Sequence, residues 1–68
     1  MRVPNLTIYD GKGEVILDLN YSIGHCKCID FNYSDNGNCV EVTYDGLYGR
    51  RHLIFPIRNI SKIEWTDN

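Results

Sequence analysis

The hydrophobic and polar residues of this chain alternate in short runs, and Gly, Asn or Asp interrupts them at intervals of about ten residues. Val, Ile, Tyr and Phe are concentrated between these interruptions, whereas alanine, the strongest helix former, does not occur. Short β-type segments at regular spacing are typical of an all-β sandwich or barrel. We therefore predict a single all-β domain over residues 1–68, a small antiparallel meander of five to six strands, folded as an SH3-like barrel or as two stacked sheets.

The first predicted hairpin turns in the glycine-rich segment 10–13. A turn centred there pairs Leu6 with Leu17 and Ile8 with Val15, and places all four side chains on one face. The opposite face then carries Thr7, Tyr9, Ile16 and Asp18.

The second predicted hairpin is centred on Asn36-Gly37, a dipeptide that favours a type I′ turn because both positions tolerate positive φ. The cross-strand pairs that it predicts are Tyr33 with Val40, Phe31 with Val42, and Ile29 with Tyr44. These large side chains share one face, and a shift of one residue would mix them with the polar set. The polar face then holds Cys28, Asp30, Asn32, Ser34, Cys39, Glu41 and Thr43.

The third predicted hairpin turns near Leu47-Tyr48, and a longer loop between the two flanking glycines explains the pattern equally well. The two-residue turn pairs Val42 with Leu53, Val40 with Phe55, Thr43 with His52, and Asp45 with Arg50. Pro56 has no N–H to donate, so we expect it at a sheet edge or a bulge. A turn or short 3₁₀ segment over 57–61 and a last strand over 62–65, with Ile63 and Trp65 facing inward, complete the predicted fold.

Composition and charge limit the class of protein. The 68 residues are 43% hydrophobic, which suffices for one small core. No apolar run approaches the roughly 20 residues of a membrane-spanning helix, and the first residues lack the apolar segment of a signal peptide, so we expect a cytoplasmic protein. The formal net charge of −2 argues against nucleic acid as the partner.

The cysteines and histidines offer little for metal or catalytic chemistry. Cys26 and Cys28 follow His25, but Cys39 lies about 20 Å from Cys28 in the predicted sheet, beyond the reach of a shared metal or a disulfide. Reduced free thiols are the simpler expectation. Neither His25 nor His52 belongs to a recognisable catalytic motif. We therefore expect no metal, no cofactor and no enzymatic activity.

The third turn and the strand after it form the segment most suggestive of function. Its candidate ligand- or partner-binding residues are Tyr44, Tyr48, Arg50, Arg51 and His52. Arginine binds phosphate or carboxylate through paired hydrogen bonds, and tyrosine rings stack on bases or anchor protein partners. Loops held on rigid hairpins often carry function.

The same residues also have a purely structural interpretation. In that interpretation Arg50 pairs with Asp45, Arg51 packs over Tyr44, and the tip of the hairpin folds back on the core. The sequence leaves both interpretations open, because single exposed apolar residues are common on protein surfaces.

A partner surface would stabilise a chain of this size. Without a disulfide or a metal its core is small, and the first hairpin carries apolar residues on both faces. The open edges of a meander can also pair between copies. We therefore expect a homo-oligomer, with a dimer favoured.

Three functional hypotheses follow from these features. The first is a small non-enzymatic binding or inhibitor protein, of the kind that phages and mobile elements encode, whose Tyr/Arg-bearing hairpin contacts a protein partner. The second is a homo-oligomer that captures a small anionic ligand, such as a nucleotide, at subunit junctions. The third is a small barrel that binds single-stranded nucleic acid, against which the net negative charge argues.

Overall fold

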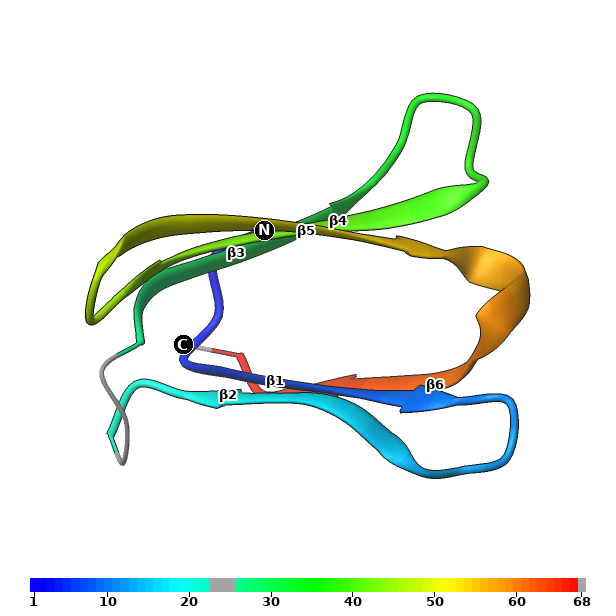
Figure 1. Ribbon diagram of the computed structural model, residues 1–68, viewed down its shortest axis with the longest axis horizontal. Helices are drawn as coiled ribbons and strands as arrows, with labels where there is room; N and C mark the ends of the chain where they lie inside the picture. The colour runs from blue at the N-terminus through cyan, green and yellow to red at the C-terminus, as the bar shows by residue number, and fades with distance from the viewer. Residues whose placement is uncertain (23–25, 68) are drawn as a thin grey trace.

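Two antiparallel three-stranded sheets lie one above the other in the computed structural model, which describes residues 1–22 and 26–67 (Figure 1). The elements are β1 (Asn5–Asp10), β2 (Val15–Asn20), β3 (Lys27–Tyr33), β4 (Cys39–Gly46), β5 (Gly49–Pro56), the 3₁₀ turn η1 (Ile57–Asn59) and β6 (Ile60–Trp65). The strand orders are β2-β1-β6 and β3-β4-β5, and in the described ranges no ladder joins the two sheets into a closed barrel. The all-β prediction is confirmed, in its two-sheet form. Across those ranges no helix has the length and apolar character needed to cross a membrane.

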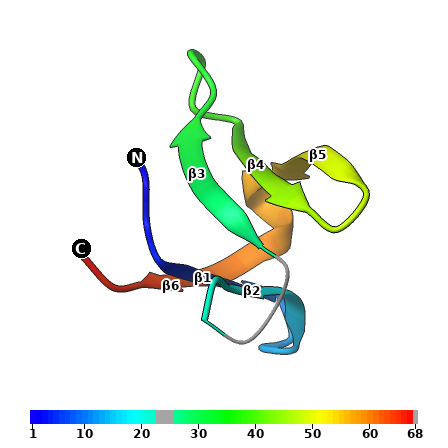
Figure 2. The same cartoon turned by 90° about the vertical axis from the view of Figure 1, so that its left-hand side faces the viewer.

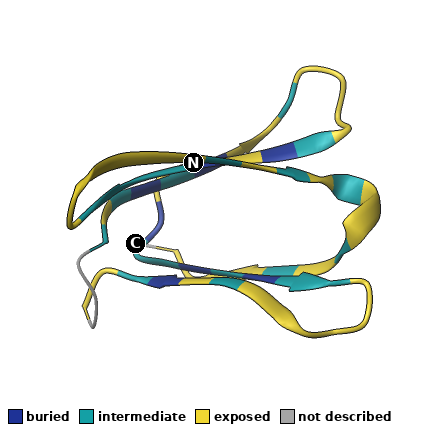
Figure 3. Cartoon of the chain, viewed as in Figure 1, coloured by how far each residue is buried: buried dark blue, intermediate teal, exposed yellow. Residues whose placement is uncertain are grey.

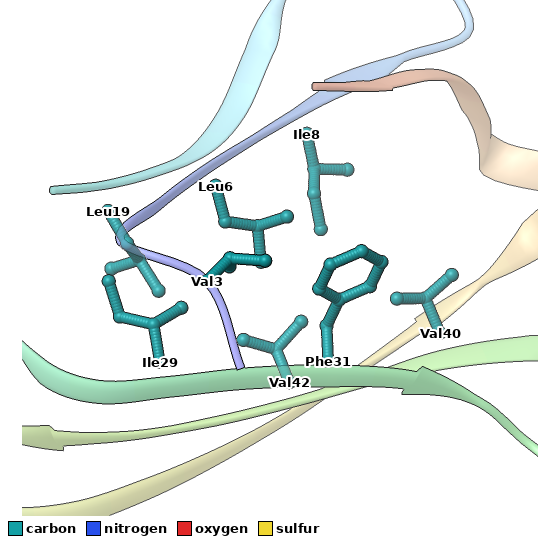
Figure 4. Packing of buried hydrophobic residues seen from close by; sticks show 8 residues of the cluster. All are labelled: Val3, Leu6, Ile8, Leu19, Ile29, Phe31, Val40 and Val42. Atoms are coloured by element: carbon teal, nitrogen blue, oxygen red, sulfur yellow. The ribbon is translucent and has the colours of Figure 1, made fainter. Parts of the chain in front are cut away.

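The hydrophobic core fills the space between the inner faces of the two sheets. Figure 4 shows side chains from both sheets pointing toward one another, with Val3 entering from the segment before β1. Burial of each such side chain contributes roughly 1.5–3 kcal/mol, so the folded state depends on these few residues. The buried residues are Val3, Leu6, Ile8, Leu19, Ile29, Phe31, Val40 and Val42.

The β3–β4 hairpin has most of the predicted register but a different turn. Tyr33 pairs with Val40 and Phe31 with Val42, as predicted. The Ser34 N–H donates to the Cys39 carbonyl at 2.9 Å across a four-residue loop, 35–38, rather than a two-residue type I′ turn. Positive φ occurs at Gly37 (74°) but not at the preceding asparagine. The register survives this change because the longer loop is centred on the same point.

A register shift interrupts the β3–β4 ladder between Lys27 and Asp30. Cys28 lies in this shift with φ of 55°, a left-handed conformation that non-glycine residues adopt only at a cost. The predicted Ile29–Tyr44 pair falls here and is not part of the recorded ladder. The predicted register, and with it the predicted polar face of β3, is therefore confirmed only from Asp30 onward.

The register predicted for the first hairpin is wrong. Leu6 pairs with Leu19 and Ile8 with Leu17, and a bulge after Ile8 brings Tyr9 opposite Val15. The cause is the turn, in which Asp10 Oδ1 accepts the backbone N–H groups of residues 12 and 14, each at 2.9 Å. The extra residue turns Val15 out to solvent, where its exposed fraction is 54%.

The C-terminal strand pairs with the first strand of the chain, a relationship that hairpin reasoning did not predict. β6 runs antiparallel to β1, with Ile8 opposite Ile63 and Leu6 opposite Trp65. The predicted 3₁₀ segment is present as η1, and Pro56 ends β5, an edge strand, as expected. Figure 2 shows β3 and β6 on one side of the molecule and β5 and β2 on the other.

Candidate functional site

The β4–β5 hairpin carries all five candidate residues, and its ladder is unbroken. Every residue from Cys39 to Gly46 has a partner on β5, ending with Gly46 opposite Gly49. Only Leu47 and Tyr48 remain in the turn, so the two-residue alternative is confirmed over the longer loop. Gly49 adopts φ of 125°, a conformation that side chains rarely permit, and this explains a glycine at that position.

Strand alternation divides the candidate residues between two faces. Tyr44 pairs with Arg51 on the face of the sheet that also carries the Val42–Leu53 pair and the core. Arg50 and His52 point to the opposite, outer face. The structure therefore does not bring the two adjacent arginines together.

The outer face holds Arg50 in an ion pair. Its Nε donates a hydrogen bond to Asp45 Oδ1 at 3.0 Å, across the strand pair that the sequence predicted. Both side chains are about half exposed, so the pair is worth only about 0.5 kcal/mol. His52 lies opposite Thr43 on the same face and is exposed. For Arg50 the structural interpretation is correct.

On the inner face, a shallow pocket of about 190 Å³ lies beneath the turn. Its walls combine aromatic, aliphatic and cationic groups. A Cβ atom built on Gly46 would lie 3.4 Å from Tyr44 Cε2 and 3.8 Å from Arg51 Cγ, so the ring and the arginine stem flank this glycine. Arg51 thus lies beside Tyr44, as the structural interpretation predicts, yet it makes no ion pair within the described part of the chain. The lining residues are Cys26, Tyr44, Gly46, Leu47, Tyr48 and Arg51.

The tip does not fold back on the core, and here the structural interpretation is wrong. Tyr48 is 96% exposed and Leu47 is 62% exposed. In Figure 3 the turn at the left end of the upper sheet is coloured as exposed along its whole length. A two-residue turn at the end of an unbroken ladder holds these side chains away from the core, because the strands beneath them are already paired.

Three residues of the pocket were not among the site residues predicted from the sequence, namely Cys26, Gly46 and Leu47. Leu47 was expected at the tip but not as part of a binding surface, although the same two-residue turn places it there. Cys26 enters from the segment before β3, on the far side of the register shift at Cys28. No periodicity in the sequence signals such a shift, so the approach of Cys26 to Tyr44 was not predictable.

Among the residues that the structure describes, the cysteine, histidine and carboxylate side chains are not grouped into a metal site. All three cysteines are free and half-buried. In the ranges that the structure describes, no three His, Cys, Asp or Glu residues are grouped to hold a metal ion, and His25 lies outside those ranges. Asp30 Oδ1 accepts a hydrogen bond from the Met1 amino group at 2.6 Å.

A polar cluster on the outer face of the lower sheet has perturbed pKa values. The Tyr9 hydroxyl donates to Glu64 Oε1 at 2.5 Å, and Lys62 Nζ lies 3.6 Å from that oxygen and 4.4 Å from the centre of the Tyr9 ring. The hydrogen bond from Tyr9, then the charge of Lys62, lowers the pKa of Glu64, and the same hydrogen bond raises the pKa of Tyr9. This cluster lies on the β2-β1-β6 sheet, whereas the candidate residues lie on the β3-β4-β5 sheet.

Comparison with protein-family models, curated proteins and solved structures found no match to this chain. The geometry of the β4–β5 hairpin carries the functional argument. Its Tyr44, Leu47, Tyr48 and Arg51, called the hairpin tip below, form an aromatic and cationic surface at the end of a rigid strand pair.

Proposed function

We propose that this chain is a small non-enzymatic binding protein whose hairpin tip contacts a protein partner. The observation that carries the proposal is the 96% exposure of Tyr48 beside the exposed Leu47, at the end of an unbroken ladder. Tyrosine and arginine are enriched among the interface residues that contribute most to binding. Burial of Leu47 alone in an interface would contribute roughly 1.5–3 kcal/mol.

The rigidity of the hairpin supports a binding role for its tip. The β4–β5 ladder runs without a bulge from Cys39 to Gly46, and the turn adds only two residues. A preorganised loop loses little conformational entropy on binding, which raises affinity for a given contact area. The tip thus suits a protein that inhibits its partner by covering a surface. Three free thiols suit action in a reducing compartment such as the cytoplasm.

The nucleotide-capture alternative receives less support from the same residues. Arg50 is bound to Asp45 on the outer face, while Arg51 lies on the inner face, so the two guanidinium groups do not converge on one phosphate. The pocket of about 190 Å³ is also smaller than the roughly 300–1,000 Å³ of small-molecule sites. A nucleic-acid surface would need several unpaired cations, and the tip contributes one.

Affinity capture with quantitative mass spectrometry tests the proposal in cells that express the protein. The unmodified protein is compared with Tyr48→Ala and with Tyr21→Ala, a matched loss of an exposed tyrosine elsewhere, since Tyr21 is 62% exposed. We expect a specific protein to be lost from the Tyr48→Ala sample and retained with Tyr21→Ala. Equal recovery of every captured protein by all three folded forms would contradict the proposal.

A further inference from the structure

The four outer strands of the two sheets differ in how their free edges are protected. The outer edge of β3 is covered by the first residues of the chain, because the Val3 N–H donates to the Ile29 carbonyl and the Phe31 N–H to the Met1 carbonyl, both at 3.0 Å. β2 and β6 are six-residue strands whose ladders to β1 each contain a register shift. Bulges and short lengths are the usual protections of an edge strand against pairing with another chain.

β5 lacks these protections. It is eight residues long, its register with β4 is unbroken, and no backbone hydrogen bond or ladder is recorded on its outer edge within the described ranges. Its one proline is the last residue of the strand. In an antiparallel pair about every second residue directs its N–H and C=O away from the partner strand, so β5 presents a row of backbone groups that no other strand pairs with.

The side chains of β5 make its centre apolar as well. Leu53 and Phe55 face the core and remain half-buried, on the side of the molecule that β5 shares with β2 (Figure 2). Ile54 faces outward with an exposed fraction of 66%. The charged residues of the strand lie at its start, where Arg50 is already held by Asp45.

We propose that β5 pairs antiparallel with β5 of a second copy of this chain, about a two-fold axis at Leu53. This register sets Arg51 opposite Phe55 of the other copy and Arg50 opposite Pro56, so that no arginine faces another. The only cation of the strand without an ionic partner in the described part of the chain then lies against an aromatic ring, a favourable cation–π arrangement. A heterologous strand offers no such built-in match, whereas two-fold pairing is self-complementary.

The pairing would join two three-stranded sheets into one of six strands and cover Leu53 on both copies. Additional buried apolar area is what a 68-residue core lacks. The two hairpin tips would point in opposite directions, with their turns about 35 Å apart at the rise of a β-strand. Leu47 and Tyr48 would stay exposed in the dimer, and Arg51 is the one residue of the hairpin tip that the pairing would engage.

Sedimentation velocity tests the second copy directly. We expect the unmodified protein, with a chain mass of 7.9 kDa, to sediment as a dimer at micromolar concentration. Ile54→Lys should convert it to a folded monomer, because a charge at the centre of the new ladder opposes pairing. Val15→Lys, a matched change at an exposed residue of β2, should leave the dimer intact. A monomer up to 100 μM (about a hundred times a micromolar Kd) or a dimer of the Ile54→Lys variant would overturn the proposal.

Disulfide cross-linking tests the register. In a background with Cys26, Cys28 and Cys39 changed to Ser, Leu53→Cys places two thiols on the two-fold axis, where directly opposed residues are about 5 Å apart and within disulfide reach. Ile54→Cys places them diagonally, beyond that reach. The pairing is supported if the Leu53→Cys variant oxidises rapidly to a covalent dimer and the Ile54→Cys variant does not. Equal rates of disulfide formation in the two variants would overturn it. Tyr48→Ala should not affect either experiment, which separates this proposal from the proposed function.

Discussion

The rings of Phe31 and Trp65 meet between the two sheets, with centroids 5.0 Å apart and planes inclined by 60°. Phe31 lies on β3 and Trp65 ends β6, strands that are distant in sequence and belong to different sheets. Trp65 also pairs with Leu6 on the central strand of the lower sheet. This contact therefore ties the C-terminal strand to the core on the side where β3 and β6 lie together.

Removal of the Trp65 ring should destabilise the protein. We expect Trp65→Ala to lower the free energy of unfolding by about 2 kcal/mol, less than for a fully buried tryptophan because this one is 39% exposed. Trp65→Phe should retain most of the stability, since a ring still reaches Phe31. Urea denaturation followed by circular dichroism measures both. A loss of less than about 0.5 kcal/mol for the alanine variant would show that the contact is unimportant.

The glycine of the β3–β4 loop should be less replaceable than a glycine in the first hairpin. Gly37 has φ of 74°, so Gly37→Ala should cost about 1 kcal/mol even though a Cβ there meets nothing within 4 Å. Gly11 has equally open space and no positive φ, so Gly11→Ala should be close to neutral. Thermal unfolding of the two variants gives the comparison, and equal melting temperatures would disprove the role of backbone conformation.

The pKa of Glu64 should depend on Tyr9. Because the folded state lowers this pKa, Glu64 contributes stability above its ordinary pKa, and the contribution is lost as the pH falls through the lowered value. Tyr9→Phe removes the hydrogen bond and should raise the pKa of Glu64 toward its ordinary value. Carboxyl NMR titration measures the shift. Tyr21→Phe serves as the control, and an unchanged Glu64 titration in Tyr9→Phe would be inconsistent with the hydrogen bond as the main cause.

The two neighbouring arginines should differ in their effect on partner binding. Arg51 borders the pocket at the hairpin tip, whereas Arg50 is engaged by Asp45 on the other face. We expect Arg51→Ala to weaken binding about tenfold, a change of about 1.4 kcal/mol, and Arg50→Ala to weaken it less than about threefold. Titration calorimetry with the captured partner distinguishes them, and the reverse order would place the binding surface on the outer face.

Local patterns predicted the hairpins that depend on side-chain alternation alone. The β4–β5 register followed from matching Val42 with Leu53 and Val40 with Phe55, and the structure has both pairs. The first hairpin was mispredicted because Asp10 closes its turn with two side-chain hydrogen bonds, which adds a bulge that alternation does not reveal. Turn chemistry, rather than hydrophobic pattern, sets the register there.

The sequence predicted which segment carries the candidate site, but not which of its side chains share one surface. Adjacent residues on a strand point to opposite faces, so the Arg50-Arg51 pair was always divided by the alternation that the sequence predicted for β5. The exposure of Tyr48 depends on the unbroken β4–β5 ladder, and the position of Cys26 depends on the left-handed Cys28, and both are properties of the folded chain. The β1–β6 pairing is likewise a long-range contact without a local signal.

Site-specific photo-cross-linking tests the binding role of the hairpin tip most directly. A benzoylphenylalanine at position 48 replaces one exposed aromatic side chain with a reactive one, and the same residue at position 21 is the control. In cells that express the protein, we predict that position 48 yields a discrete covalent adduct with another protein and that position 21 does not. Adducts of equal identity and yield at both positions, or none at position 48, would contradict a partner-binding tip.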